Sequence, residues 1–317
     1  MTTPAIPHNS IGLALGSGAA RGLAHIGVLK VLEAEGIPIS CIAGTSIGAL
    51  IGALYAAGVP LARMEEVARN VDWQQMAGLI DPIIPTSGLI DGKKVAHFIS
   101  ELLPVETFEE LRMPLAVLAT DVESGELLVI RRGLLREALR AAISFPGIFT
   151  PVHFAGRFLV DGGLCNPVPV DVARDLGATR VIGVCAIPEV EKRPQEAFLP
   201  NPRRDQPRKN PLFDFFDSSM VERLLRDLWP LGESDEPRHL EKGRKPPGLL
   251  RIFAQCIAIM ENEINSLRLA RDGADVLLRP ELNGVTLLEF NKADEIIHAG
   301  EEAARAELAA IRALTGH

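Results

Sequence analysis

The chain has 317 residues, of which 47% are hydrophobic and 23% are charged, the balance of a globular protein rather than of a disordered one. Lysine and arginine total 33 against 41 acidic residues, which gives a formal net charge of −8 at pH 7. Nucleic-acid binders normally present a basic face, so the composition argues against nucleic acid as a partner. The length allows either two domains or one large α/β domain.

The cysteines and the N-terminal residues indicate the compartment. The cysteines are far apart and lack the spacing of a zinc site or a redox pair, and three of them lie in apolar surroundings. We therefore expect buried free thiols in a reducing compartment. Residues 1–10 show no basic stretch followed by an apolar one, so no signal peptide is visible. These features predict a cytoplasmic protein with a short tail at residues 1–9. The four cysteines are Cys41, Cys165, Cys185 and Cys256.

Residues 36–62 contain no charged side chain and are numerous enough to cross a bilayer. Gly44, Gly48 and Gly52 even have the spacing of packed membrane helices. Two prolines interrupt the segment, however, and its β-branched beginning is typical of a buried parallel strand. We therefore predict a buried strand followed by a buried helix.

Residues 10–187 alternate short apolar runs with helical stretches, the pattern of βαβ units around a mostly parallel sheet. This part is predicted to form the core of an α/β domain. The expected strands are Ile11–Leu15, Ile39–Ala43, Leu115–Thr120, Leu127–Ile130, Phe158–Val160 and Arg180–Cys185. The expected helices are Gly22–Glu35, Ile47–Ala57, Leu61–Asn70, Lys93–Leu103, Leu134–Ala142 and Val170–Leu176. From residue 249 we expect a helix to about residue 272, a strand at Asp275–Leu278 and a final helix at Asn291–Leu314.

A G-x-S-x-G pattern at Gly44-Thr45-Ser46-Ile47-Gly48 lies between a predicted strand and a predicted helix. In this context a serine sits on a tight, strained turn that exposes its hydroxyl, and the flanking glycines allow close backbone approach. The helix that follows adds a positive dipole end near a developing negative charge. Ser46 is therefore a candidate nucleophile; the alternative is a glycine-rich turn with a capping serine.

A second glycine-rich turn, Gly16-Ser17-Gly18-Ala19-Ala20-Arg21-Gly22, follows the first predicted strand. Unpaired backbone N–H groups in such a turn can bind a phosphate or an oxyanion. A dinucleotide fingerprint would place glycine where Arg21 stands, and no acidic residue ends the next strand. The Walker pattern is also absent. An oxyanion site is favoured over a nucleotide site.

Asp161-Gly162-Gly163 directly follows a predicted strand. The carboxyl ends of sheet strands are where α/β proteins place ligands, so Asp161 is a candidate catalytic carboxylate. The alternative is an ordinary turn, because Asp-Gly is a common turn pair.

The three motifs, in this order, resemble those of bacterial patatin-like phospholipases, a branch of the patatin family of serine acyl hydrolases. Ala142-Ile143-Ser144-Phe145-Pro146 and Asn166-Pro167-Val168-Pro169 match as well. The resemblance implies a mostly parallel sheet between two layers of helices, and a Ser46–Asp161 dyad without histidine. It also implies an oxyanion loop at Gly16, Gly18, Ala19 and Arg21, in which N–H groups around Gly18 and Ala19 donate and Arg21 orients the loop. Gly44, Gly48, Gly162 and Gly163 complete the motifs.

The resemblance implies a lipid or another acyl ester as substrate, of the phospholipase or lysophospholipase type, with neither a cofactor nor a metal. The catalytic residues alone would equally suit a thioesterase or an acyltransferase. A non-catalytic lipid-binding regulator with the same fold is the alternative from another class of protein. A histidine triad is a further alternative: His298 and His317 come last in the chain, as an α/β-hydrolase requires, but they lie in or after a polar terminal helix. His25 is expected to be structural.

Residues 188–248 have a different composition from the rest of the chain. Residues 189–248 hold nine of the 23 prolines and equal numbers of acidic and basic residues, so this segment is predicted to be an insertion. An apolar helix face is predicted downstream of a basic run, formed by Val221, Leu224, Leu225 and Leu228. The helix either packs on its own domain or forms a flap that covers the acyl site and touches anionic lipid at the inner membrane surface. Residues 249–317 are predicted to complete the domain.

Overall fold

The computed structural model describes residues 10–71, 78, 81, 88–187 and 249–315. The chain divides into two compact units, residues 1–188 with 260–317, and residues 189–259. The first unit contains the sheet and the candidate site. The predicted insertion at residues 188–248, with its possible flap, lies outside the described residues.

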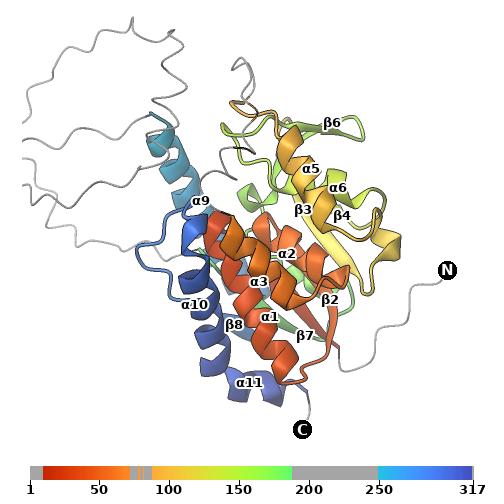
Figure 1. Ribbon diagram of the computed structural model, residues 1–317, viewed down its shortest axis with the longest axis vertical. Helices are drawn as coiled ribbons and strands as arrows, with labels where there is room; N and C mark the ends of the chain where they lie inside the picture. The colour runs from red at the N-terminus through yellow and green to blue at the C-terminus, as the bar shows by residue number, and fades with distance from the viewer. Residues whose placement is uncertain (1–9, 72–77, 79–80, 82–87, 188–248, 316–317) are drawn as a thin grey trace, which may run out of the picture. The chain divides into compact units, whose positions relative to one another are not determined.

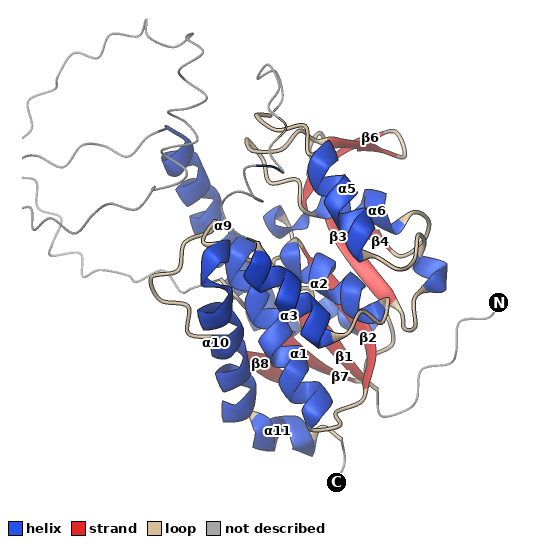
Figure 2. Ribbon diagram, viewed as in Figure 1, coloured by secondary structure: helices blue, strands red, loops and turns tan. Residues whose placement is uncertain are grey.

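Eight strands of the described residues form one sheet in the order β5-β6-β3-β2-β1-β7-β8, with β4 also paired to β3. The central pairs, β3 with β2, β2 with β1, β1 with β7 and β7 with β8, are parallel, whereas β4, β6 and β5 pair in antiparallel fashion at one edge (Figure 2). This confirms the α/β class with a parallel centre. The strands are β1 (Ile11–Leu15), β2 (Ile39–Thr45), β3 (Leu115–Asp121), β4 (Leu127–Ile130), β5 (Val152–Phe154), β6 (Arg157–Asp161), β7 (Arg180–Val184) and β8 (Val276–Leu278).

Both faces of the sheet are buried, because successive side chains of each strand enter opposite cores. In β2, Ile42 enters one hydrophobic cluster while Cys41 and Ala43 enter the other. In β3, Val117 and Leu118 divide in the same way. Runs of apolar residues without alternation in the sequence therefore correspond to strands covered on both sides.

Helices cover each face. The first cluster contains residues of α1, α2, α3, α5, α6 and α10, and the second contains residues of α7 and of the end of α9, so the first unit has three layers, as expected. The helices are α1 (Ala24–Ala34), α2 (Ile47–Ala56), α3 (Leu61–Asn70), α5 (Lys93–Leu102), α6 (Leu135–Ala142), α7 (Val170–Asp175), α9 (Leu249–Asp272), α10 (Ala293–Ala306) and α11 (Leu308–Ala313), with 3-10 turns η1 (Ala19–Leu23), η2 (Phe108–Glu110), η3 (Gly162–Leu164) and η5 (Phe290–Lys292).

Two glycines let α1 and α10 cross with their backbones in contact. A methyl group on Gly27 would lie 1.9 Å from the carbonyl oxygen of Ile297, and one on Gly300 would lie 2.0 Å from that of Ala24. Lys30 of α1 bridges to Glu301 of α10 at 2.5 Å beside this crossing. Figure 1 shows the two helices side by side, in red and dark blue.

The structure differs from the sequence-based expectation at three places. Strand β5 was not predicted, because Val152–Phe154 is too short to show a period, and it is defined only by pairing with β6. The first helix begins as a 3-10 turn at Ala19–Leu23. The expected helix at residues 291–314 is interrupted at Glu307, and the shorter α11 buries Ile311 completely.

The uncharged segment at residues 36–62 forms β2 and α2, as predicted. Gly52 packs α2 on the sheet, since a methyl group there would lie 2.8 Å from Cγ2 of Ile42. No helix among the described residues is both long enough and apolar enough to cross a membrane.

The cysteines only partly match expectation. All four are thiols; Cys41 and Cys185 are buried, but Cys165 is half-buried and Cys256 is exposed. Burial raises the pKa of Cys41 to about 11, so this thiol is an inert core residue.

Candidate active site

Ser46 occupies a strained turn between β2 and α2. Its backbone has φ 57° and ψ −127°, outside the regions that L-residues ordinarily adopt, and its carbonyl accepts the first N–H groups of α2 from Ala49 and Leu50. Thr45 fixes the preceding residue by donating its hydroxyl to the carbonyl of Asn166 at 2.8 Å. The turn therefore presents the Ser46 side chain at the N-terminus of α2, as the G-x-S-x-G pattern predicted.

Gly44 and Gly48 are required by close backbone contacts on either side of this turn. A methyl group on Gly44 would lie 2.5 Å from Cα of Ala49, and one on Gly48 would lie 2.3 Å from the carbonyl oxygen of Leu15. No side chain fits at either position. The motif glycines thus let α2 begin directly against the end of β1.

Asp161 lies next to Ser46 because of the strand register. Thr45 of β2 pairs with Leu118 of β3, and Asp161 of β6 pairs with Ala119 of the same strand, so Ser46 and Asp161 flank one point of β3. Asp161 was predicted from the rule that ligands bind at the carboxyl ends of parallel strands. β6 runs antiparallel to β3, however, so this rule does not explain why Asp161 lies at the site. A methyl group on Gly162 would lie 2.6 Å from the Leu118 carbonyl, so only glycine lets the turn pass over β3.

The two candidate catalytic side chains are hydrogen-bonded. The Ser46 hydroxyl donates to Oδ2 of Asp161 at 2.6 Å, and the N–H of Gly163 donates to Oδ1 at 2.8 Å. The backbone N–H of Asp161 donates to the Ser144 carbonyl at 3.0 Å, and the Ser144 hydroxyl accepts from the buried Arg140 guanidinium at 2.5 Å. Asp161 is therefore held through both its carboxylate and its backbone.

Burial controls the charge of Asp161. The residue is 3% exposed, and the loss of water raises its pKa to about 6, although hydrogen bonds from Ser46 and Gly163 act in the opposite direction. At pH 7 the carboxylate is ionised but binds a proton more readily than an exposed aspartate. Such a carboxylate is suited to take the proton of a hydroxyl at 2.6 Å.

The glycine-rich loop leaves two N–H groups without an acceptor among the described residues. The N–H of Gly16 donates to the Val184 carbonyl and that of Arg21 donates to the Gly18 carbonyl, whereas those of Gly18 and Ala19 have no acceptor there. Ala19 has φ 50°, a left-handed conformation that an alanine adopts here in spite of its Cβ. The available donors are thus the two N–H groups around which the oxyanion hole was predicted.

Arg21 and His25 hold this loop from behind. Nε of Arg21 donates to the Val285 carbonyl at 2.7 Å, and Nε2 of the fully buried His25 donates to the Gly16 carbonyl at 2.8 Å. Burial lowers the pKa of His25 to about 4, so the ring is neutral at pH 7. Both side chains act on the loop's conformation.

The family of the chain follows from its sequence. Residues 13–174 match the family model described as patatin-like phospholipase. The chain belongs to this family. The membership confirms the resemblance seen in the motifs, together with the expected hydrolase class, and the matched residues include Ser46, Asp161 and the glycine-rich loop.

Three known proteins illustrate the similarity. An uncharacterized NTE family protein of Mycobacterium tuberculosis is 29% identical over 334 residues, covering 95% of this chain and 91% of that protein. A patatin-like phospholipase domain-containing protein of Caenorhabditis elegans is 33% identical over 300 residues, covering 92% of this chain but 20% of that protein. The crystal structure of VipD from Legionella pneumophila has a TM-score of 0.48 and 13% identity, with 95% of this chain and 67% of that chain covered.

Glu261 was missed by the sequence analysis and lies outside residues 13–174, the part that matches the patatin-like model. It sits on α9 with its carboxyl against Gly163: a methyl group on Gly163 would lie 2.3 Å from Oε1 of Glu261. The available signal was a polar residue on the inner face of an amphipathic helix, where Asn265 and Leu269 follow at intervals of four.

In this patatin-like fold the described histidines do not contact the candidate dyad. His97, His153 and His298 are exposed, and neither they nor His25 hydrogen-bonds Ser46 or Asp161. His317 lies outside the described residues. In the described part of the chain, Asp161 is therefore the titratable side chain that is hydrogen-bonded to Ser46.

We expect a variant with His25, His298 and His317 all replaced by glutamine to retain the chemical step. His25→Gln should lower stability by about 1–2 kcal/mol, because the buried imidazole that places an N–H on the Gly16 carbonyl is lost and the flexible glutamine amide replaces its packing and its hydrogen bond imperfectly. Steady-state kinetics of an ester substrate, alongside thermal unfolding, measures both effects. A fall in kcat of about a hundredfold in a folded variant in which only His298 and His317 are replaced, so that His25 still holds the loop, would show that a histidine takes part in catalysis.

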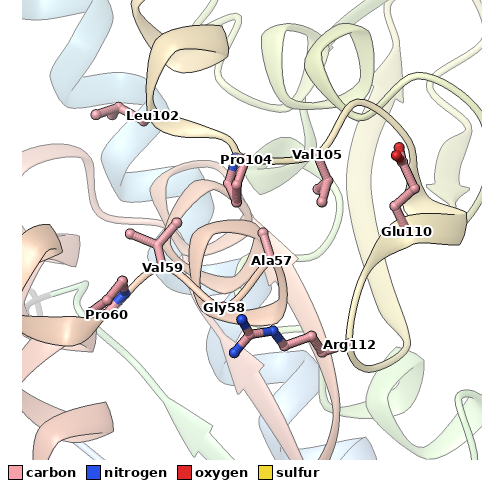
Figure 3. Close-up of a pocket in the computed structure, with 9 residues that line it drawn as sticks. All are labelled: Ala57, Gly58, Val59, Pro60, Leu102, Pro104, Val105, Glu110 and Arg112. Atoms are coloured by element: carbon pink, nitrogen blue, oxygen red, sulfur yellow. The ribbon is translucent and has the colours of Figure 1, made fainter.

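A pocket of about 410 Å³ lies away from the dyad, at the other end of α2 (Figure 3). Ser46 precedes the first residue of α2, and the pocket begins at Ala57, just after the last one, so about 15 Å of helix separates them. The Arg112 side chain lies against Gly58 in this pocket. The pocket is lined by Ala57, Gly58, Val59, Pro60, Leu102, Pro104, Val105, Glu110 and Arg112.

Proposed function

We propose that the protein hydrolyses carboxylic esters of lipids, of the phospholipase or lysophospholipase type, through a Ser46–Asp161 dyad. The observation that carries the proposal is the Ser46 hydroxyl, which donates to the buried Asp161 carboxylate at 2.6 Å from a strained turn at the start of α2. Family membership supports a lipid as the source of the ester.

In the proposed acylation step, the Ser46 proton moves to Oδ2 of Asp161 while Oγ attacks the acyl carbonyl carbon. The tetrahedral intermediate carries its negative charge on the former carbonyl oxygen. Asp161 then returns the proton to the leaving alkoxide, which departs as an alcohol and leaves the acyl group on Ser46. A water molecule repeats the sequence: its proton goes to Asp161, its oxygen attacks the acyl-enzyme, and the carboxylic acid is released as Ser46 regains a proton.

The N–H groups of Gly18 and Ala19 are the proposed oxyanion donors. They have no acceptor among the described residues, and they belong to the loop after β1, the strand next to β2 and Ser46. One oxyanion donor typically contributes about 3–4 kcal/mol to the stability of the transition state. Arg21 and His25 would act through this loop, by fixing its conformation from behind.

The proposal is tested by a hydrolysis panel of phospholipids, lysophospholipids, acyl thioesters and short p-nitrophenyl esters, with Ser46→Ala as the blank. Cleavage of lipid esters by the wild type alone is the expected result. Preference for thioesters would instead favour the thioesterase alternative. Binding of lipid vesicles without hydrolysis, and without labelling of Ser46 by a fluorophosphonate probe, would favour a lipid-binding regulator.

We expect kcat/KM to fall as the pH is lowered through about 6. Asp161 must be ionised to accept the Ser46 proton, and its folded-state pKa is raised to about 6, so protonation below that pH removes the base. A pH–rate profile with a soluble p-nitrophenyl ester, in which lipid aggregation plays no part, measures this limb. A profile that stays level down to about pH 4.5 would contradict the role of Asp161.

A further inference from the structure

The region around Asp161 contains a second carboxyl that the proposed mechanism does not use, that of Glu261. Oε1 of Glu261 and Oδ1 of Asp161 lie 2.3 Å and 3.2 Å from the point where a Gly163 side chain would begin. The two oxygens are therefore no farther apart than the sum of those distances. The absence of a side chain at Gly163 is what lets both carboxyls occupy this place.

Helix α9 places the half-buried Glu261 on its inner face. Asn265, one turn further along, is 3% exposed and donates its amide to Sγ of Cys185 at 3.2 Å, and Leu269 after it packs in the second hydrophobic cluster. Glu261 lies on the same face of the helix. Among the described residues no lysine, arginine or histidine forms an ion pair with it.

A carboxyl in this position favours its neutral form. Burial, and then the charge of Asp161, raise the pKa of Glu261 to about 8, whereas that of Asp161 is about 6. Among the residues packed against Glu261, Asp161 is the one whose charge raises the pKa of Glu261. Ser46, which is hydrogen-bonded to the other carboxylate oxygen of Asp161, is neutral. Two like charges at such short range do not both ionise readily, and the pair titrates as a unit.

We propose that Glu261 is a positioning residue that sets the charge of the catalytic carboxylate: the two carboxyls share one proton at neutral pH, and Glu261 holds it. Asp161 is then the ionised member, next to Ser46, and the site carries a single negative charge. This inference rests on the proposed function for its kinetic consequences, but the shared proton itself is a property of the folded protein.

Ionisation of Glu261 has opposite consequences for two kinds of substrate. With a second negative charge in the site, an anionic phospholipid is repelled, because like charges a few ångströms apart interact strongly away from bulk water. A neutral ester meets no such repulsion, and Asp161 beside an ionised Glu261 is a stronger base. A neutral Glu261 therefore suits the site to an anionic lipid.

The first experiment follows stability and requires no activity. Urea unfolding is measured from about pH 5 to pH 9 for the wild type, Glu261→Gln, Asp161→Asn and the double variant. A glutamate whose folded-state pKa is raised stabilises the fold fully below its unfolded pKa, about 4.5, and that contribution is lost as the pH rises through about 8. We expect the folding equilibrium constant of the wild type to fall relative to Glu261→Gln by up to about tenfold per pH unit.

The Asp161→Asn background isolates the coupling between the two carboxyls. Without the Asp161 charge the pKa of Glu261 is lower, so the fall relative to the double variant should end at a lower pH. Glu263→Gln, an exposed position on the same helix, is the matched control and should show no such trend. Parallel pH dependences of the wild type and Glu261→Gln would overturn the shared proton, whatever the protein hydrolyses.

The second experiment is the pH profile of kcat/KM with an anionic phospholipid and with a neutral p-nitrophenyl ester. For the wild type we expect a fall of several-fold above about pH 8 with the phospholipid and none with the neutral ester. Glu261→Gln should lose the alkaline fall and keep the limb near pH 6. An unaltered alkaline limb in Glu261→Gln would overturn the kinetic role of Glu261. Absence of hydrolysis by the wild type would overturn the proposed function, and the urea experiment alone would then test whether the two carboxyls share a proton.

Discussion

Replacing Ser46 with alanine is expected to abolish ester hydrolysis, and replacing Asp161 with asparagine to reduce it at least about a hundredfold. The first change removes the hydroxyl that donates to Asp161 and whose oxygen attacks the acyl carbon. The second removes the base, and general-base catalysis typically contributes about 10²–10⁴-fold. Turnover of a soluble p-nitrophenyl ester at about pH 7.5, with active-site titration by a fluorophosphonate, measures both.

Both variants should fold. Asparagine retains a side-chain oxygen that can accept the N–H of Gly163, and the change removes a buried charge, so the melting temperature of Asp161→Asn should equal or exceed that of the wild type at pH 7. Asp171→Asn, on α7, is a control aspartate outside the dyad and should keep its turnover. A folded Asp161→Asn variant that retains more than about a tenth of the wild-type turnover would contradict the proposed dyad.

Replacing Gly27 or Gly300 with alanine is expected to destabilise the fold by about 3 kcal/mol or more. At either position the new methyl group would meet a backbone carbonyl of the other helix at 2.0 Å or less, and a backbone cannot rotate away as a side chain can. Relief requires α1 and α10 to separate, which opens the core between them; overpacking usually costs about 1–3 kcal/mol even where side chains can move. Urea unfolding of the two variants measures the effect.

Gly78→Ala is the matched control. Gly78 is exposed, and no atom of the other described residues lies within 4 Å of the place that a new methyl group would take, so the same substitution should leave the free energy of unfolding within about 0.5 kcal/mol. Wild-type stability of Gly27→Ala would mean that the two helices do not cross at the contact distance described. The loss should be equally large in a Ser46→Ala background, because the crossing does not involve the dyad.

The sequence by itself determined the class of fold and the identity of the candidate dyad. Apolar runs without alternation marked strands buried on both faces, and the strands expected between residues 10 and 187 all begin and end within two residues of the observed ones. Ser46 could be predicted because a strained turn between strand and helix needs glycine on both sides, and the G-x-S-x-G pattern of five consecutive residues contains both glycines. Such signals are local, so the residues that carry them stand together in the chain.

Only the tertiary structure decided which groups meet at the site. Asp161 faces Ser46 through the register of two strands against β3, and 115 positions separate the two residues in the chain. The N–H groups of Gly18 and Ala19 were expected as donors from the sequence, but only the structure shows that they have no acceptor among the described residues while those of Gly16 and Arg21 are bonded to carbonyls. The sequence hardly indicated Glu261 as a site residue, because a glutamate in a helix has the same sequence pattern whether its side chain faces water or a buried aspartate. Its environment comes from packing against Gly163, and burial, which changes the charge of a carboxyl, is a property of the folded chain.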